Sequence, residues 1–119
     1  MAEELKQKFL PDEYIFRQGE KGNKAYLLLD GRVAIEVNEK KVSEISEMEI
    51  FGEMSLILKK PRSASIRVLK PSVVLPIDQI ILNELLEKSP PVIKSIVKQL
   101  SYRLAQCDTE IQALKNKTI

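Results

Sequence analysis

The sequence predicts an α+β fold in which an antiparallel β-roll is followed by helices. Up to about residue 77, short runs of β-forming residues alternate with turn residues, a pattern typical of an antiparallel sandwich or barrel. From Asp78 onward the apolar residues recur at helical spacing instead. At 119 residues the chain has the usual length of one domain. We therefore expect a single domain over 1–119, with the roll at about 5–77 and the C-terminal helices at about 78–116.

The first half is predicted to form short strands separated by glycine, proline and acidic turn residues. Asp30-Gly31 falls between two of these runs, which predicts a hairpin turn at this point. The expected strands cover residues 5–10, 14–16, 25–29, 33–37, 41–45, 65–69 and 73–77.

Two helices are predicted after the roll. Asp78 is placed to cap a short helix that ends near Ser89. Ser89 followed by Pro90 and Pro91 is typical of a cap and the first turn of a second helix, which we expect to reach about Leu114.

The charge balance gives no electrostatic case for nucleic-acid binding. The chain has 19 Lys and Arg against 17 Asp and Glu, and the basic residues form no long run. No apolar run approaches the roughly 20 residues that a membrane helix needs, and the N-terminus does not resemble a secretory signal. We therefore expect a soluble, cytoplasmic protein that binds neither nucleic acid nor a membrane.

The residue types present also argue against catalysis. The chain has no histidine and one cysteine, Cys107. The composition argues against a structural zinc site, whose ligands are chiefly Cys and His, and a histidine-activated nucleophile is excluded. No paired constellation for acid–base chemistry is evident. The lone cysteine fits a reducing compartment. We expect no enzyme activity, no metal and no cofactor.

Residues 51–65 carry the strongest functional signal. Gly52 allows close backbone approach, and Glu53–Leu58 is suited to one helical turn whose first N–H groups have no internal partners and favour a phosphate. Arg62 could return as a bidentate phosphate ligand, with Ser63 adding a hydroxyl donor. This pattern predicts an anion site. The alternative is a surface salt bridge between Glu53 and Arg62 beside a turn.

These residues resemble the phosphate-binding cassette of the cyclic-nucleotide-binding domain family, of the catabolite activator and kinase regulatory subunit type. The matching elements are Phe51-Gly52-Glu53, two small or apolar residues, a leucine, a short loop, and Arg62-Ser63-Ala64. Segments 11–22, 26–37 and 90–104 also resemble the family's opening strand, its hairpin and its last helix. The resemblance covers most of residues 5–104 and implies a jelly-roll-like double-stranded β-helix with a short cassette helix.

The resemblance also implies roles for individual residues. Glu53 would accept a hydrogen bond from the ribose 2′-hydroxyl, and Arg62 would pair with the cyclic phosphate. Further contacts to the phosphate would come from the backbone N–H groups of Gly52, Met54 and Ser55 and from the Ser63 hydroxyl. By a looser alignment, Cys107 and Asp108 would cap the base. Serine rather than threonine at position 63 favours cAMP over cGMP as the ligand.

Four departures from the family pattern leave an alternative open. Met48 stands where the family usually has glycine, which predicts an altered turn before the cassette, and Asp12 replaces another glycine. The family's first helix and a winged helix are not evident, so we expect a stand-alone sensor module. The alternative is a relative that binds no nucleotide and acts as a dimerisation or protein-docking module.

The second C-terminal helix has a coiled-coil seam. A parallel pair would bring together opposite charges beside it, Arg103 with Asp108 and Glu110 with Lys115. We expect a homodimer through this helix; the alternative is that one apolar face packs on the chain's own roll. The seam residues, spaced by four and three, are Ile93, Val97, Leu100, Leu104, Cys107, Ile111 and Leu114.

Overall fold

The computed structural model describes the backbone of residues 5–117 and the side chains of residues 5–106. The chain divides into two compact units, Met1–Ile80 and Ile81–Ile119. The first unit contains the strands and a short helix, and the second contains most of the C-terminal helical part. Each unit is described by itself.

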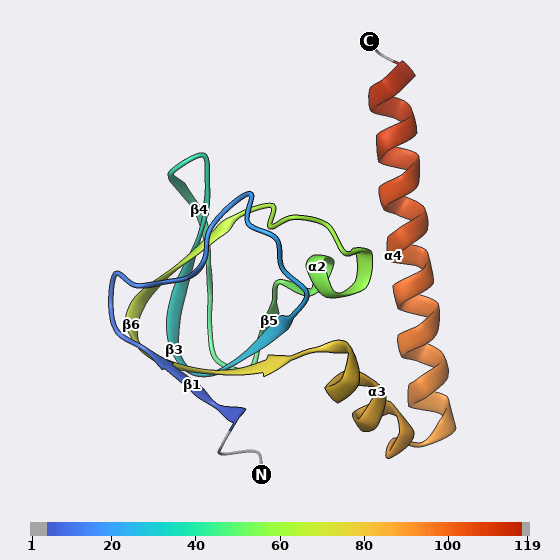
Figure 1. Cartoon of the computed structure of the whole chain (residues 1–119), viewed down its shortest axis with the longest axis horizontal. Coiled ribbons are helices and arrows are strands. Elements are labelled where there is room, and N and C mark those ends of the chain that lie inside the picture. The colour runs from blue at the N-terminus through green and yellow to red at the C-terminus, as the bar shows by residue number, and fades with distance from the viewer. Residues whose placement is uncertain (1–4, 118–119) are drawn as a thin grey trace. The chain divides into compact units, whose positions relative to one another are not determined.

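The strands of the first unit form one antiparallel sheet that curls into a roll, as Figure 1 shows. The main path runs β1-β6-β3-β4, and β2 and β5 pair with β6 and β3 respectively. The predicted α+β class with an antiparallel roll is confirmed. The strands are β1 (Gln7–Phe9), β2 (Tyr14–Phe16), β3 (Ala25–Val37), β4 (Lys40–Ile45), β5 (Ile50–Phe51) and β6 (Ser65–Ile77).

The expected hairpin at Asp30-Gly31 is wrong, because β3 continues through it as one strand of 13 residues. Its partner β6 is also continuous, and the register between the two shifts on either side of Asp30. Gly31 has a φ of +109°, and a Cβ there would lie 2.7 Å from the Cα of Ser72. The glycine therefore serves a bulge in which two long strands bend together, rather than a chain reversal.

The chain reversal occurs at Asn38-Glu39 instead. Val37 pairs with Lys40, which leaves a loop of two residues between β3 and β4. Asn38 and Glu39 have φ values of 53° and 67°. Positive φ at both central residues is what a type I′ hairpin requires, and its twist matches that of the strands.

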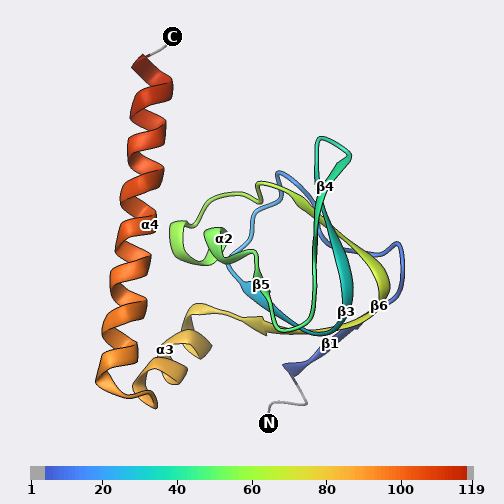
Figure 2. The same ribbon diagram turned by 180° about the vertical axis from the view of Figure 1, so that it is seen from behind.

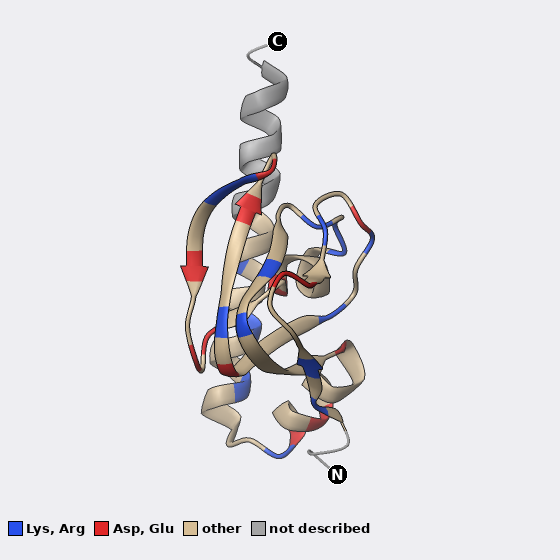
Figure 3. Ribbon diagram, turned by 90° about the vertical axis from the view of Figure 1, so that its left-hand side faces the viewer, with Lys and Arg blue, Asp and Glu red and all other residues tan. Residues whose placement is uncertain are grey.

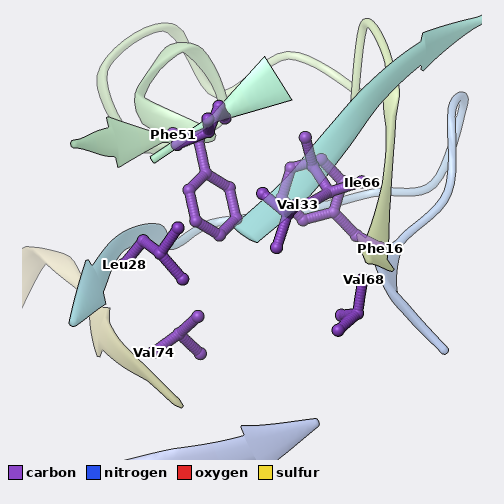
Figure 4. Packing of buried hydrophobic residues seen from close by; sticks show 8 residues of the cluster. Phe16, Leu28, Val33, Phe51, Ile66, Val68 and Val74 are labelled. Carbon is purple, nitrogen blue, oxygen red and sulfur yellow. The ribbon is translucent and has the colours of Figure 1, made fainter. Parts of the chain in front are cut away.

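The core of the roll is a cluster of aliphatic and aromatic side chains. Figure 4 shows these side chains pointing from β2, β3, β5 and β6 into one interior. Leu28, Val33, Val68 and Val74 are completely shielded from solvent. Along β6 the buried residues fall on alternate positions, so one face of this strand points inward. In β3, Leu28 and Val33 are five positions apart and both are buried, because the register shifts around Gly31 lie between them. The cluster consists of Phe16, Leu28, Val33, Ile45, Phe51, Ile66, Val68 and Val74.

Two helices follow the roll, α3 (Gln79–Glu87) and α4 (Pro91–Lys117), joined by a short turn that Figure 2 shows from behind. As expected, α3 begins directly after Asp78. The expected cap on α4 is wrong, because the Ser89 hydroxyl donates to the carbonyl of Leu85, 2.8 Å away in α3. The carbonyl of Pro90 instead accepts the first bonds of α4, from the N–H of Ile93 at 3.0 Å. Among the described residues, no helix is both long and apolar enough to cross a membrane.

Candidate functional site

One cavity of about 300 Å³ collects the cassette residues on one side of the roll. Its walls come from β2, the strands β3 to β5, the cassette helix α2 (Glu53–Leu58), the loop after it and the start of β6. Its size lies within the range of small-molecule sites. All six residues predicted to bind ligand line it: Gly52, Glu53, Met54, Ser55, Arg62 and Ser63.

Gly52 is required at the start of the cassette helix by both its backbone and its neighbours. It precedes α2 with a φ of 76° and a ψ of 11°, a left-handed conformation that costs glycine little. A Cβ at this position would lie 2.8 Å from Nη1 of Arg62 and 3.1 Å from Cε2 of Phe16. Any other residue would therefore displace the arginine or the aromatic ring beneath it.

Ser55 closes the cassette loop. Its side chain is buried, and its hydroxyl donates to the carbonyl of Lys60 at 2.8 Å. The helix ends at Lys59, which takes a left-handed conformation with a φ of 56°. Because the hydroxyl proton of Ser55 is used in this bond, the hydroxyl has no donor left for an anion.

Arg62 is the buried cation of the cavity, with 6% of its surface exposed. Its Nη1 donates to the carbonyl of Gly52 at 3.0 Å. Its backbone pairs with the opening turn, since its N–H donates to the carbonyl of Glu20 and its carbonyl accepts from the N–H of Gly19, both at 2.8 Å. Burial lowers the pKa of the guanidinium from its usual range, while Tyr26 and Glu20 oppose this effect.

No ion pair joins Arg62 to a carboxylate among the described side chains. The alternative in which Glu53 and Arg62 form a surface salt bridge is therefore wrong. Glu53 is exposed at the cavity, whereas Arg62 is buried. A buried charge is costly when no carboxylate pairs with it directly, so the guanidinium is suited to an incoming anion.

Three aromatic rings lie beneath the cassette. The Phe16 and Phe51 centroids are 6.0 Å apart, and Tyr26 stacks on Phe51 at 5.5 Å with an angle of 16° between the rings. The guanidinium carbon of Arg62 lies 3.9 Å from the centroid of Phe16 and 5.8 Å from that of Tyr26. The cation therefore sits on an aromatic floor that the sequence analysis did not anticipate.

The sequence analysis also missed the β4 side of the cavity, where Ser43, Glu44 and Glu49 contribute to the lining. Lys41 and then Arg32 donate to Glu44, which lowers the pKa of its carboxyl group. Both the hydroxyl and the N–H of Ser46 donate to Glu49, at 2.7 Å and 3.0 Å, and lower its pKa in the same way. The β3–β4 register brings Ser43 and Glu44 to the cassette, and no local motif signals that register. Glu49 directly precedes β5 and so lies next to the cassette in the sequence.

The turn before the cassette keeps a glycine-like backbone although Met48 replaces the glycine. Met48 has a φ of 67°, and its side chain is 67% exposed. Its N–H donates to the carbonyl of Leu28 at 2.6 Å, and the N–H of Leu28 donates to the carbonyl of Glu49 at 3.0 Å. Met48 therefore adopts a left-handed φ that glycine favours, and its backbone in this turn is strained.

The predicted base-capping residues Cys107 and Asp108 lie in α4, but their side chains are outside the described residues. The contribution of these two residues therefore stays a prediction. The remaining predicted residues lie in the first unit, around the cavity.

The fold and the cavity define this protein as a β-roll domain with a pocket for one small ligand. A family model described as "Cyclic nucleotide-binding domain" matches residues 6–89. The chain belongs to this family, and the expected family resemblance is confirmed.

Protein kinases and their regulatory subunits are among the relatives. The chain is 35% identical over 80 residues to a cGMP-dependent protein kinase of Eimeria tenella, covering 67% of this chain and 8% of the kinase. It is 30% identical over 106 residues to the cGMP-dependent protein kinase of Toxoplasma gondii, covering 88% of this chain and 10% of that kinase. It is 42% identical over 62 residues to the cAMP-dependent protein kinase regulatory subunit of Candida albicans, covering 51% of this chain and 14% of that subunit. The chain thus spans a small part of each relative.

Solved structures include a close match in fold, the half-site-occupied form of the EAL enzyme Bd1971. That comparison has a TM-score of 0.81 and 29% identity, and covers 87% of this chain and 96% of the other. The same enzyme has been solved with cAMP bound, at a TM-score of 0.62 and 27% identity, covering 95% and 31% of the two chains. Its cGMP-bound form has a TM-score of 0.64 and 28% identity, covering 94% and 34%.

Proposed function

We propose that the cavity binds a cyclic nucleotide and that the chain acts as a regulatory sensor module rather than as an enzyme. The observation that carries this proposal is Arg62, a buried guanidinium at the cavity with no carboxylate partner among the described side chains. A cyclic phosphate carries the single negative charge and the oxygen acceptors that this cation lacks. The exposed hydroxyl of Ser63 lies beside it at the same cavity.

The remaining cassette residues divide between the phosphate and the sugar in this proposal. The backbone N–H groups of Gly52, Met54 and Ser55 bind phosphate oxygens, and the exposed carboxylate of Glu53 accepts from the ribose 2′-hydroxyl. A carboxylate next to a phosphate site would be repulsive unless it faced a donor. A sugar hydroxyl supplies that donor.

The preferred ligand in this proposal is cAMP, with cGMP as the alternative. Ser63 supports the preference, because family members similar to the cGMP binders often have threonine at this position. The relatives include kinases named for each nucleotide, and Bd1971 has been solved with either one. Affinity for both nucleotides, with cAMP tighter, is therefore the expected pattern.

Calorimetric titration of the ligand-free chain with cAMP, with cGMP and with 5′-AMP tests this function. We expect saturable binding of both cyclic nucleotides and much weaker binding of 5′-AMP, whose open phosphate carries additional charge. A chain that binds neither cyclic nucleotide at millimolar concentration would instead be the dimerisation or docking module.

We further propose that the protein acts in the cytoplasm as a homodimer through α4. Several apolar side chains of this helix are exposed, including Ile93 and Leu100 of the predicted seam. A second copy of the same helix would cover them with the matching seam and with opposite charges on either side.

A further inference from the structure

The guanidinium of Arg62 lies over the ring of Phe16. The guanidinium carbon stands 3.9 Å from the ring centroid, well within the range of a cation–π interaction. Both side chains are buried, with 6% of Arg62 and 9% of Phe16 exposed. At a site that is largely shielded from water, the attraction between a cation and an aromatic face is stronger than on an exposed surface.

Several neighbours restrict the guanidinium further. Gly22 lies so close that a Cβ there would come within 2.6 Å of Nη2 of Arg62. Nη1 is bonded to the carbonyl of Gly52 at 3.0 Å. A guanidinium that stacks on an aromatic face keeps the N–H donors along its edge available for hydrogen bonds.

We propose that Phe16 is a positioning residue for the ligand: its ring holds the guanidinium of Arg62 in place at the cavity before the phosphate of the nucleotide arrives. This inference rests on the function proposed above and extends it to a residue outside the cassette. Phe16 reaches the cavity from β2, 46 positions before Arg62 in the sequence, so no cassette motif includes it.

The effect on affinity follows from side-chain freedom. An arginine on a long flexible stem loses rotational freedom when a ligand fixes it, and this loss weakens binding. If Phe16 already fixes Arg62 in the free protein, the loss is avoided. Removing the ring should therefore weaken cyclic-nucleotide binding by about twofold to twelvefold, which corresponds to the immobilisation of one long side chain.

The test compares dissociation constants for cAMP and cGMP in the full chain with two changes at position 16. Phe16→Leu removes the ring, and replacement of Phe16 by 3,5-difluorophenylalanine keeps its shape but reduces the negative charge of its face. We expect both variants to bind more weakly than wild type, with the fluorinated protein in between. A role limited to packing would leave the fluorinated protein at wild-type affinity.

Two controls separate positioning from stability. Val74→Ala removes core volume away from the cavity, and difluorophenylalanine at Phe9 places the same fluorines on a ring of β1. Both should keep wild-type affinity. If wild type binds neither nucleotide, the proposed function falls, and the role of Phe16 falls with it. If wild type binds and the fluorinated Phe16 protein binds equally well, the role of Phe16 alone is overturned.

Discussion

Glu36 Oε2 accepts a 2.6 Å hydrogen bond from Arg67 Nε, across the pairing of β3 with β6. The other carboxylate oxygen accepts from the hydroxyl of Tyr14 at 2.8 Å, and Nη1 of Arg67 continues to Asp12 at 3.2 Å. Glu36 is 7% exposed. This network joins β2, β3 and β6. Figure 3 shows that acidic and basic residues are interspersed over the roll.

The network should make stability depend on pH in the acid range. The hydrogen bond from Arg67, followed by that from Tyr14, lowers the pKa of Glu36. The stabilisation is therefore fully present above the unfolded pKa of about 4.3 and is lost as the pH falls from there through the folded value. Thermal unfolding followed by circular dichroism should show a midpoint for wild type that drops in this window. Glu36→Gln should lower the midpoint at neutral pH and flatten the drop. The exposed Glu47→Gln should behave as wild type does, and a similar flattening there would contradict the assignment to Glu36.

Gly31→Ala should destabilise the roll by more than its backbone conformation alone explains. A left-handed φ costs an L-residue about 1–2 kcal/mol, and the added methyl would also press on the backbone of Ser72. Gly19→Ala is the matched control, because Gly19 has a φ of +88° but no atom within 4 Å of a Cβ. Urea unfolding should give a larger loss for Gly31→Ala than for Gly19→Ala. Equal losses would mean that the close approach to Ser72 contributes nothing.

Met48→Gly should stabilise the protein by about 0.5–1 kcal/mol, because glycine adopts the left-handed turn without strain. The gain is smaller than the strain itself, since glycine also has more freedom in the unfolded chain. Met48→Ala keeps the strain and removes only an exposed side chain, so its unfolding free energy should stay near wild type. Chemical denaturation of both variants measures the difference. A less stable Met48→Gly would show that the turn does not strain Met48.

Within the cassette, Arg62→Lys should weaken cyclic-nucleotide binding by about tenfold or more while the roll stays folded. Lysine keeps a charge but loses the planar donor fork and the stacking on Phe16. Glu53→Gln should instead reduce the preference for the ribose over the 2′-deoxyribose form of the ligand. Calorimetry with both sugars distinguishes the two. An unchanged sugar preference in Glu53→Gln would remove the role given to this carboxylate.

The proposed dimer has a covalent test. In a parallel pair of α4 helices each Cys107 would face its own copy, so mild oxidation should produce a disulfide-linked dimer on a non-reducing gel. Leu104→Lys combined with Ile111→Lys should give monomers in light scattering and leave the circular dichroism of the roll unchanged. Wild-type protein that stays monomeric at hundreds of micromolar, with and without nucleotide, would refute the dimer.

The sequence predicted the position of the cassette helix, Glu53–Leu58, correctly because this turn depends on local residues. Gly52, which directly precedes this helix, and Ser55, whose hydroxyl bonds to Lys60, both lie within the cassette. The contacts of Arg62 with Gly19 and Glu20 come from outside it. The long strands were predicted less well. Glycine after aspartate indicates a turn only when the strands on either side pair with each other, and here both segments pair with the distant β6.

The aromatic floor and the β4 wall were missed for a related reason. In the sequence, Phe16 has the pattern of an ordinary core residue. Only the fold brings it into contact with Arg62, which lies 46 positions later. Ser89 shows the same limitation on a smaller scale. Its hydroxyl had two helices within reach, and it bonds to the end of α3 rather than to the start of α4.

The pairing of β3 with β6 also has a kinetic consequence. It joins Ala25 to Ile77 and Glu36 to Ser65, so the chain must close long loops before any of these contacts forms. Such non-local pairing places a β-rich domain among the slower folders, on a scale of about milliseconds to seconds. Residues 51–64 lie inside the loop that the pairing of Glu36 with Ser65 closes. The cavity needs this pairing to be in place, because residues of β3 and β6 line it, so a ligand binds only after these non-local contacts have formed.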